Sequence, residues 1–543
     1  MLFLADFLDT LLRGAVLAGV SLALGGLAWQ LWVVRPWQHR VPDTAVRRGL
    51  ALLGSGALVV AAGQALLLVL KALVLSDSFG RDALGGFVVT LHFIAAAARI
   101  LGALAVACAV LWLRRAPDAA SRWVAVAALA SLLAASGAWL THATGRVEYR
   151  PALMALTALH QVAAAIWVGG LAQLAAYWWL SRRHAAADAL WPDVVGRFSR
   201  LALASVVVAV LAALPLTWTY TGSISGLVGT GYGALVLTKT VLLGAALLLA
   251  AFNLKAARRA REPRAPAALR TRLPYLVEGE AILLVMILFT AATLSAQPPS
   301  VDQAAGDHAT VGEVVEVFRP KLPSLHTPSV DIMRVNRAEA AAPGERSRAA
   351  SRWSNFSHNV AGLILLAMSV VALGGSVLRT GGGRHWPLGF VALAAFVYLR
   401  AAANEGTWPF GTVPLWKIDA EGIQHRIAAL LVLALGALEW RARAKPDRGS
   451  LLPYVFPALG AAGAVLLLTH SHAAFQSKPS FLVQVTHTTM GALAALLVAG
   501  RWLELRLAPP AARLAGAAAT VAMLMIALIL VFYREANLLI PPD

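Results

Sequence analysis

Hydrophobic residues fill long, nearly continuous stretches of this chain, and short polar connections separate them. Each stretch holds about 20 residues, which is the length an α-helix needs to cross a bilayer. The stretches lie at about residues 7–34, 49–70, 84–113, 123–141, 152–180, 201–220, 232–254, 273–296, 356–378, 386–403, 422–440, 451–470, 481–500 and 514–533. The pattern predicts an all-α, polytopic helical membrane protein with about fourteen transmembrane helices.

The composition supports a membrane protein. Only 13% of the residues are charged and 59% are hydrophobic, whereas a soluble domain carries about 25% charged residues. The single cysteine, Cys108, excludes an internal disulfide and a cluster of thiolate ligands.

Lys and Arg are concentrated in alternate connections. Seven connections hold 27 of them, including Arg35, Arg40, Arg47 and Arg48 in the first, and the short connections on the other side hold far fewer. Because short cytoplasmic loops retain positive charge, both termini are predicted to lie outside. The formal charge of +19 is then explained by topology and an anionic lipid surface, without nucleic acid as a partner.

One segment, residues 297–355, is polar and rich in Pro and Ala. Topology places it outside the membrane, where its alternating VVEVF stretch suggests a short strand. We therefore expect three parts: an eight-helix membrane domain at 1–296, a periplasmic linker at 297–355, and a six-helix membrane domain at 356–543.

Three histidines gather toward the outer side of the first domain. His142 closes the fourth predicted span, and His92 and His160 each lie about eight residues inside their own spans. Trp167 shares a helix face with His160, and the following Gly169 and Gly170 favour close helix packing. Imidazole is the commonest protein metal ligand, so His92, His142 and His160 form a candidate metal site.

Four further histidines repeat this arrangement in the last six helices. They are His425, His470, His472 and His487, all on the predicted outer side, with Met490 as a possible soft ligand three residues after His487. The steps of 50 and 18 residues in the first set resemble the steps of 45 and 17 in the second, which suggests parallel repeats of the kind found in transporters. A single histidine at a membrane interface has a simpler interpretation, an ordinary hydrogen bond, and both interpretations stay open.

Charged residues within the predicted spans include Arg99, Lys239, Glu278 and Glu280. Charges inside a bilayer are costly and are commonly paired or functional. One interpretation is an intramembrane polar track that conducts an ion or proton. The other is a structural ion pair, such as Arg99 with a glutamate.

Several spaced motifs carry a resemblance to a known family. In order they are His142, LHQVAAAIWVGGL, GRFSRLALASVVV at 196–208, YGALVLTKTVLLGAALLLAAFNLKAARR at 232–259, and the later FRPKLPSL. This order resembles the CopD/PcoD copper-resistance membrane family over about residues 1–330. The resemblance implies copper movement across the bacterial inner membrane, often with a periplasmic copper-binding partner of the CopC type.

These observations predict a copper transporter that takes up its ion at periplasmic histidines, and not an enzyme. The sequence has no phosphate-binding loop, so transport is expected to be passive, proton-coupled or driven by a partner. A first alternative is a membrane cytochrome whose paired histidines bind haem b, because haem iron accepts two axial imidazoles. A second alternative is a metal sensor or scaffold without flux.

Overall fold

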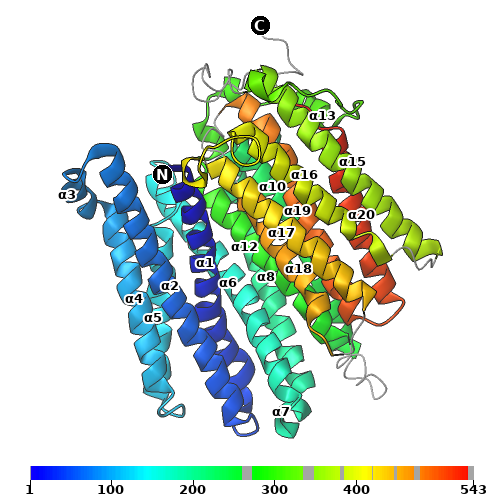
Figure 1. The fold of residues 1–543 in the computed structure, drawn as a ribbon. Coiled ribbons are helices and arrows are strands. Elements are labelled where there is room, and N and C mark those ends of the chain that lie inside the picture. Colours follow the sequence, from blue (N-terminus) through cyan, green and yellow to red (C-terminus); the bar gives the residue numbers. More distant parts are fainter. Residues whose placement is uncertain are drawn as a thin grey trace. The chain divides into compact units, whose positions relative to one another are not determined.

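The computed structural model describes residues 2–259, 272–333, 348–378, 384–418, 420–445, 449–469 and 477–535. Helices dominate these residues and no strand occurs among them (Figure 1). Thirteen of the described helices are long and apolar enough to cross a membrane. The predicted fold class, an all-α polytopic membrane protein, is confirmed.

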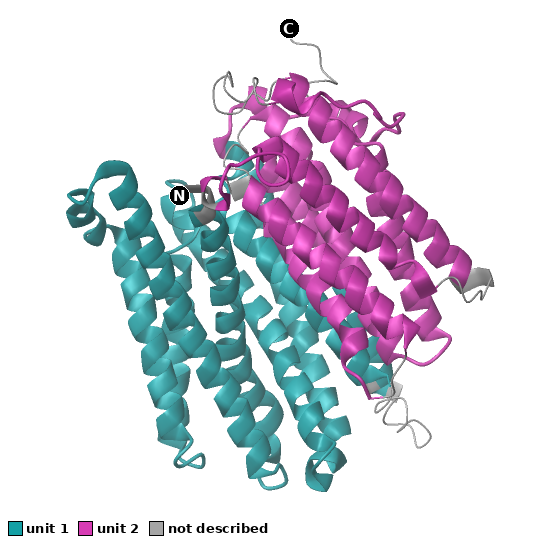
Figure 2. Cartoon of the chain, in the orientation of Figure 1, with its two compact units in different colours: residues 1–222, 243–301 teal, residues 223–242, 302–543 magenta. Residues whose placement is uncertain are grey.

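The chain forms two compact units (Figure 2). Unit 1 comprises Met1–Gly222 and Leu243–Val301, and unit 2 comprises Ser223–Leu242 and Asp302–Asp543. Helix α10, Gly231–Arg259, therefore contributes its first part to unit 2 and its second part to unit 1. The predicted division at residues 296 and 355 stays a prediction. The two compact units are defined by contacts between residues, and such contacts do not show which parts of the chain fold alone.

Unit 1 is built from long helices that run alternately up and down. Besides the second part of α10, these are α1 (Leu2–Ala28), α2 (Asp43–Phe79), α4 (Leu91–Leu113), α5 (Ala120–Ala138), α6 (Arg150–Ser181), α8 (Trp191–Thr221) and α12 (Leu273–Ala296). Shorter elements connect them: η1 (Trp29–Val34), η2 (Arg35–Trp37), α3 (Ala83–Val88), η3 (His142–Gly145) and α7 (Ala185–Ala189). Helix α1 is central, since it packs against α2, α6 and α12.

Small residues let the central helices of unit 1 approach closely. A Cβ atom added at Gly169 of α6 would overlap the backbone carbonyl of Ser21 in α1, and one at Gly170 would overlap the Phe198 ring of α8. Branched and small apolar side chains fill the neighbouring core, including the fully buried Leu50 and Leu53 of α2. The predicted role of the two glycines in helix packing is confirmed.

Unit 2 has a similar up-and-down construction. Its long helices are α15 (Arg348–Leu378), α16 (Leu388–Glu405), α17 (Ala420–Ala444), α18 (Val455–Thr469), α19 (Lys478–Arg506) and α20 (Ala511–Val531). Its short elements include α9 (Ile224–Val228), η4 (Ser300–Asp302, at the boundary of the units), η5 (Ala305–Asp307), α13 (Val311–Phe318), η7 (Leu415–Lys417) and η8 (Leu452–Tyr454). Helix α19 packs against α18 and α20, while α15 packs against α16 and α20.

The predicted span at residues 422–440 folds as helix α17, which is not among the thirteen apolar helices. It lies between α16 and α18 and carries charged residues toward both ends, including Arg426, Glu439 and Arg443. Two of these pair with acidic or basic residues of neighbouring helices. The helix is present where the sequence predicted it, but its polarity distinguishes it from the others.

The expected short strand at VVEVF is wrong, because residues Val311–Phe318 form helix α13. Thr310 caps the helix through the backbone N–H of Glu313, and the Glu313 carboxylate accepts from the backbone N–H of Thr310. This reciprocal capping box satisfies two backbone donors that a helix start would leave unpaired. Val314 and Val317 then share one buried face. The buried apolar residues are three positions apart, as in a helix, and do not alternate as they would in a strand.

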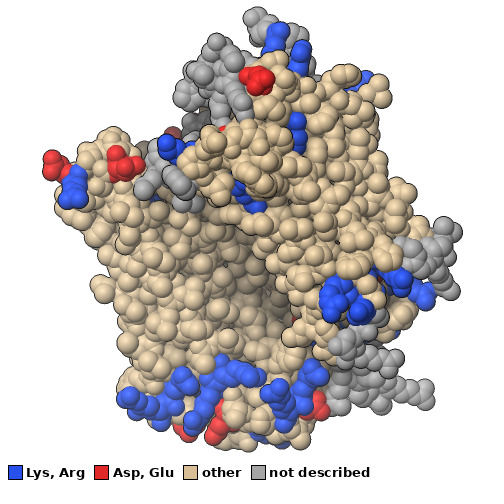
Figure 3. Space-filling model, in the orientation of Figure 1, with Lys and Arg blue, Asp and Glu red and all other residues tan. Residues whose placement is uncertain are grey.

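Basic side chains collect at one end of the unit 1 helices (Figure 3). The exposed arginines of the first connection are Arg35 in η2, Arg40 in the turn after it, and Arg47 and Arg48 at the start of α2. We call this the inner end of unit 1, following the predicted orientation, and the end that holds η3 the outer end. Which membrane surrounds the protein stays a prediction.

Candidate functional site

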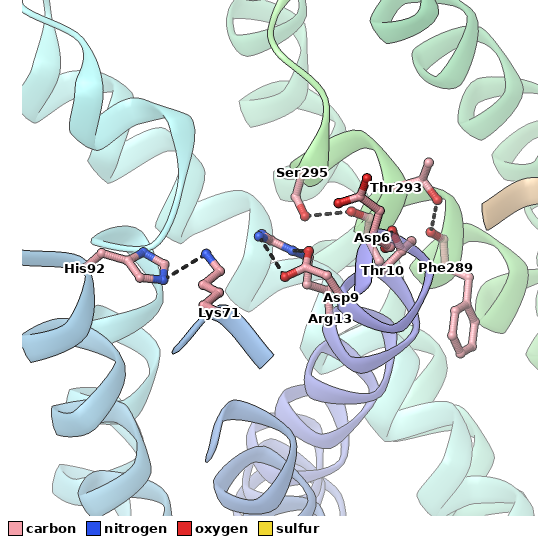
Figure 4. A network of polar contacts seen from close by, with 10 residues as sticks. Asp6, Asp9, Thr10, Arg13, Lys71, His92, Phe289, Thr293 and Ser295 are labelled. Atoms are coloured by element: carbon pink, nitrogen blue, oxygen red, sulfur yellow. Dashed lines mark hydrogen bonds and ion pairs between the residues drawn. The ribbon is translucent and has the colours of Figure 1, made fainter. Parts of the chain in front are cut away.

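His92 lies in the first turn of α4, at the outer end of unit 1. Its Nε2 atom is 3.0 Å from Nζ of Lys71 on α2. Figure 4 shows this pair in one polar network with the ion pair between Asp9 and Arg13 of α1. Nε2 of His92 therefore has Lys71 as its neighbour in this structure, and a metal role for His92 stays a prediction.

His142 lies in η3, directly after α5, as the sequence predicted for the outer end. Its ring approaches Tyr220 of α8 edge to face, with ring centroids 6.3 Å apart. The guanidinium of Arg146 lies 5.3 Å from the centroid of the same tyrosine ring. His142 therefore belongs to an aromatic and cationic group that joins η3 to the outer end of α8.

His160 is half-buried within α6, and its Nδ1 atom lies 2.8 Å from the carbonyl oxygen of Ala209 on α8. A carbonyl only accepts, so the imidazole is the donor. The neutral ring then carries its hydrogen on Nδ1 and its lone pair on Nε2. Metal-binding histidines are commonly oriented in this way, with one ring nitrogen on a carbonyl and the other on the metal.

The structure does not bring His92, His142 and His160 together. Among the residues it describes, no group of three His, Cys, Asp or Glu side chains is placed to hold a metal ion. Each histidine has a different neighbour: Lys71 on α2, Tyr220 on α8, and the backbone of Ala209. The expected convergence at equal depth is therefore absent, and a metal role for each residue stays a prediction.

A buried carboxyl group occupies the centre of unit 1. Glu280 of α12 is 2% exposed. Its Oε1 accepts from the indole N–H of Trp167 on α6 at 2.9 Å, and its Oε2 accepts from Nδ2 of Asn253 on α10 at 2.7 Å. Trp167 and Asn253 are themselves buried. Three helices therefore meet at one carboxyl group within the membrane region.

The hydrogen-bond partners described for this carboxyl group do not include the other charged residues of the predicted polar track. Arg99 is buried on α4, next to Gly137 of α5. In the described part of the chain, its guanidinium forms no ion pair with a glutamate. Glu278 is half-buried and lines a small cavity with Trp178 and Trp191. Lys239 is half-buried in the part of α10 that belongs to unit 2, and a continuous track stays a prediction.

In unit 2, His487 of α19 lies next to His358 of α15. The ring centroids are 5.6 Å apart and the ring planes are perpendicular. Nδ1 of His358 bonds to the carbonyl of Ser354 at 2.9 Å, and Nδ1 of His487 bonds to the carbonyl of Val483 at 3.1 Å. Tyr533 stacks on His358 at a centroid distance of 4.0 Å. We call His358, His487 and Tyr533 the aromatic trio.

The remaining members of the second predicted set are less informative. His425 is exposed on α17, and the predicted ligands His470 and His472 lie outside the described residues. Met490 is buried one turn after His487 on α19. Sequence analysis did not place His358 in a site, because nothing in its spacing indicates that α15 and α19 meet at this level.

A comparison with protein families matches one part of the chain. Residues 192–294 match the model of the CopD family, described as copper resistance protein D. We call this stretch, which is similar to the CopD family, the CopD region. A search of curated proteins finds no match, and a search of solved structures finds none. The match confirms the predicted resemblance over a shorter stretch than residues 1–330, and it implies a copper-resistance membrane protein.

The CopD region spans α8, α10 and most of α12. It contains Ala209, which orients His160, and both Asn253 and Glu280 of the buried carboxyl cluster. The sequence indicated that Glu280 is a charged residue within a predicted span, but it did not indicate that Trp167 and Asn253 are its partners. A polar Asn within the apolar AAFNL stretch was the signal available for Asn253.

Proposed function

We propose that this chain carries copper across the bacterial inner membrane, taking it up at histidines on the periplasmic side and contributing to copper homeostasis or resistance. The observation that supports this most directly is the bond from His160 Nδ1 to Ala209 in the CopD region. In this proposal the metal binds His160 through Nε2, because Nδ1 is bonded to the carbonyl. Imidazole suits Cu(II), whereas Cu(I) favours softer ligands.

Incomplete coordination at His160 is consistent with transport. A conducting site must bind its ion well enough for entry and weakly enough for exit. In the described residues, no second His, Cys, Asp or Glu pair completes a three-ligand cage around it. His160 therefore fits a station on a path better than a storage site, and no ATP-dependent step or enzymatic reaction belongs to this proposal.

The aromatic trio supports a second copper station in unit 2. Both histidines bond through Nδ1 to a carbonyl four residues earlier on their own helices, so both present Nε2 as the coordinating atom. A metal bound at about 2 Å from Nε2 lies about 3 Å from the ring centroid. A centroid separation of 5.6 Å is therefore within reach of one ion shared by His358 and His487. A periplasmic partner of the CopC type would deliver that ion.

Copper uptake by proteoliposomes tests the proposal. We expect His160→Ala to lower uptake at least tenfold, because the Nε2 ligand is lost. The matched control is His184→Ala, since His184 is exposed beside α7 at the inner end, and uptake should stay at the wild-type level. Equal uptake by both variants, with helical content intact, contradicts a copper station at His160.

The same purified protein separates the alternatives. A Soret band with reducible α-bands in its absorption spectrum supports the haem b cytochrome and contradicts copper transport as the main function. Stoichiometric copper binding without uptake supports a sensor or scaffold. Loss of one bound copper in both His358→Ala and His487→Ala, with His385→Ala as the control on an exposed histidine, supports the second station.

A further inference from the structure

The Glu280 carboxyl group is bonded by neutral donors. The indole of Trp167 and the amide of Asn253 each donate one hydrogen bond to it, and neither side chain carries a charge. An ionised carboxylate in a membrane interior is costly unless a cation or metal compensates it. A carboxyl group with only neutral partners can therefore take up a proton without breaking an ion pair.

No charged group among the described residues bonds to Glu280. Among the side chains that the structure describes on α12 and on the neighbouring helices α1, α6 and α10, the other titratable or charged ones are Asp6, Asp9 and Arg13 on α1, Arg150, His160 and Tyr177 on α6, Tyr232, Lys239, Lys255 and Arg258 on α10, and Tyr275 and Glu278 on α12. On α1, the charged residues lie in the half of the helix nearer its outer end, whereas Glu280 lies in the inner half of α12. His160 precedes Trp167 by two helical turns on α6.

Asn253 has an unused acceptor beside the carboxyl group. Its Oδ1 atom is buried and has no hydrogen-bond partner, while its Nδ2 donates to Glu280 Oε2. The side-chain amide of Asn carries a donor, the NH2 group, and an acceptor, the oxygen. A rotation of 180° about the Cβ–Cγ bond exchanges the positions of these two groups. The present orientation suits an ionised Glu280. The rotated orientation suits a protonated Glu280, because Oδ1 then accepts the hydrogen of Oε2–H.

We propose that Glu280 is a proton-binding site within the membrane region of unit 1, and that Asn253 serves both protonation states by rotating its amide. One proton joins Oε2 of the carboxylate and the product is a neutral carboxylic acid. Trp167 donates to Oε1 in both states and holds the group in place. The proton-binding site does not depend on the proposed function. Its use to couple copper movement to a proton gradient does rest on the proposed function.

Infrared difference spectroscopy of the full chain in lipid nanodiscs, between acidic and alkaline pH, tests the proposal. We expect a carbonyl stretching band of a protonated carboxylic acid that titrates with pH and disappears in Glu280→Gln. Glu278→Gln is the matched control, because it makes the same change two residues away on α12, and it should keep the band. A band that survives in Glu280→Gln, or the absence of any titrating band in the wild type, overturns the proposal.

Two further variants identify the band even where Glu280→Gln fails to fold. Trp167→Phe removes the donor to Oε1 and should shift the band to higher frequency. Asn253→Leu removes a hydrogen bond that is stronger to the ionised group than to the neutral one, so the titration midpoint should rise by roughly one pH unit. No movement of the band in either variant contradicts the assigned partners.

Copper uptake separates this proposal from the proposed function. If both hold, uptake depends on a proton gradient in the wild type and loses that dependence in Glu280→Gln. If wild-type vesicles take up no copper while the infrared band titrates, copper transport fails and the proton site stands. If uptake occurs without a titrating band, the proton site fails and copper transport stands.

Discussion

The imidazole of His160 donates through Nδ1 to the carbonyl oxygen of Ala209, which joins α6 to α8 across 49 residues of sequence at 2.8 Å. The bond connects a histidine outside the matched CopD region to a backbone group inside it. It determines which ring nitrogen carries the hydrogen in the neutral imidazole.

Nitrogen NMR of the histidine-labelled protein checks this tautomer. We expect His160 to show a protonated Nδ1 and an unprotonated Nε2 at alkaline pH, with the signals assigned by their loss in His160→Gln. Added Cu(II) should broaden the Nε2 signal first, because that nitrogen is the ligand. A protonated Nε2 in the metal-free protein contradicts the orientation.

The close approach of α1 and α6 predicts a large cost for a single methyl group. Gly169→Ala places a Cβ atom against the backbone carbonyl of Ser21, and backbone atoms of α1 move only if the helices separate. We expect a loss of about 1–3 kcal/mol in the free energy of unfolding, measured by denaturant titration in detergent.

Gly102 of α4 is the matched control for this substitution, because a Cβ atom there meets nothing within 4 Å. Gly102→Ala should leave stability unchanged or raise it by up to about 1 kcal/mol. Equal effects at the two glycines contradict the close contact between α1 and α6.

A buried ion cluster in unit 2 depends on Glu439 of α17. Its side chain is 0% exposed, and it pairs with Arg443 at 2.7 Å and with Arg501 of α19 at 2.8 Å. Glu439→Gln leaves two guanidinium groups without this carboxylate, and breaking a buried pair costs about 3–5 kcal/mol. Thermal unfolding monitored by circular dichroism measures the loss.

Glu316 supplies the comparison for Glu439. Its side chain is 43% exposed, and it pairs with Arg319 at 3.3 Å. Because solvent screens an exposed pair, Glu316→Gln should cost less than about 1 kcal/mol. The interpretation of Glu439 fails if both variants unfold at the same temperature.

Helix α13 predicts a pH-dependent contribution to stability. Burial alone would raise the pKa of Glu313, but hydrogen bonds from Lys478 and from Thr310 hold the pKa below its usual value. A carboxyl group with a lowered pKa stabilises the fold above its unfolded pKa of about 4.3, and this contribution is lost as the pH falls through the folded pKa.

Glu313→Gln tests this contribution. At pH 7 the variant should be less stable than the wild type by about 1 kcal/mol, through loss of the capping box and the partly exposed pair with Lys478. At about pH 3 the difference should shrink, because the wild-type carboxyl group is then protonated as well. A difference that is constant from pH 7 to pH 3 excludes the charged interaction.

Local signals in the chain were sufficient for some features and not for others. The long apolar stretches predicted the helices, and the Gly169–Gly170 pair predicted a close helix contact. The strand expected at residues 314–318 was wrong, because apolar alternation was weighed and the Thr310–Glu313 capping signal was not. His92, His142 and His160 were expected to form one site, but similar depth along separate helices says nothing about the rotation of those helices or about the neighbours of each side chain.

By itself, the sequence determined that this is an all-α membrane protein, where its basic connections lie, and which segment resembles CopD, since bilayer thickness and charge act on each segment separately. Only the tertiary structure decided that Glu280 bonds to Trp167 and Asn253, that His160 is oriented by Ala209, and that His487 lies next to His358. The reason is physical: each partnership depends on the rotation and crossing of helices, and those follow from packing over the whole bundle.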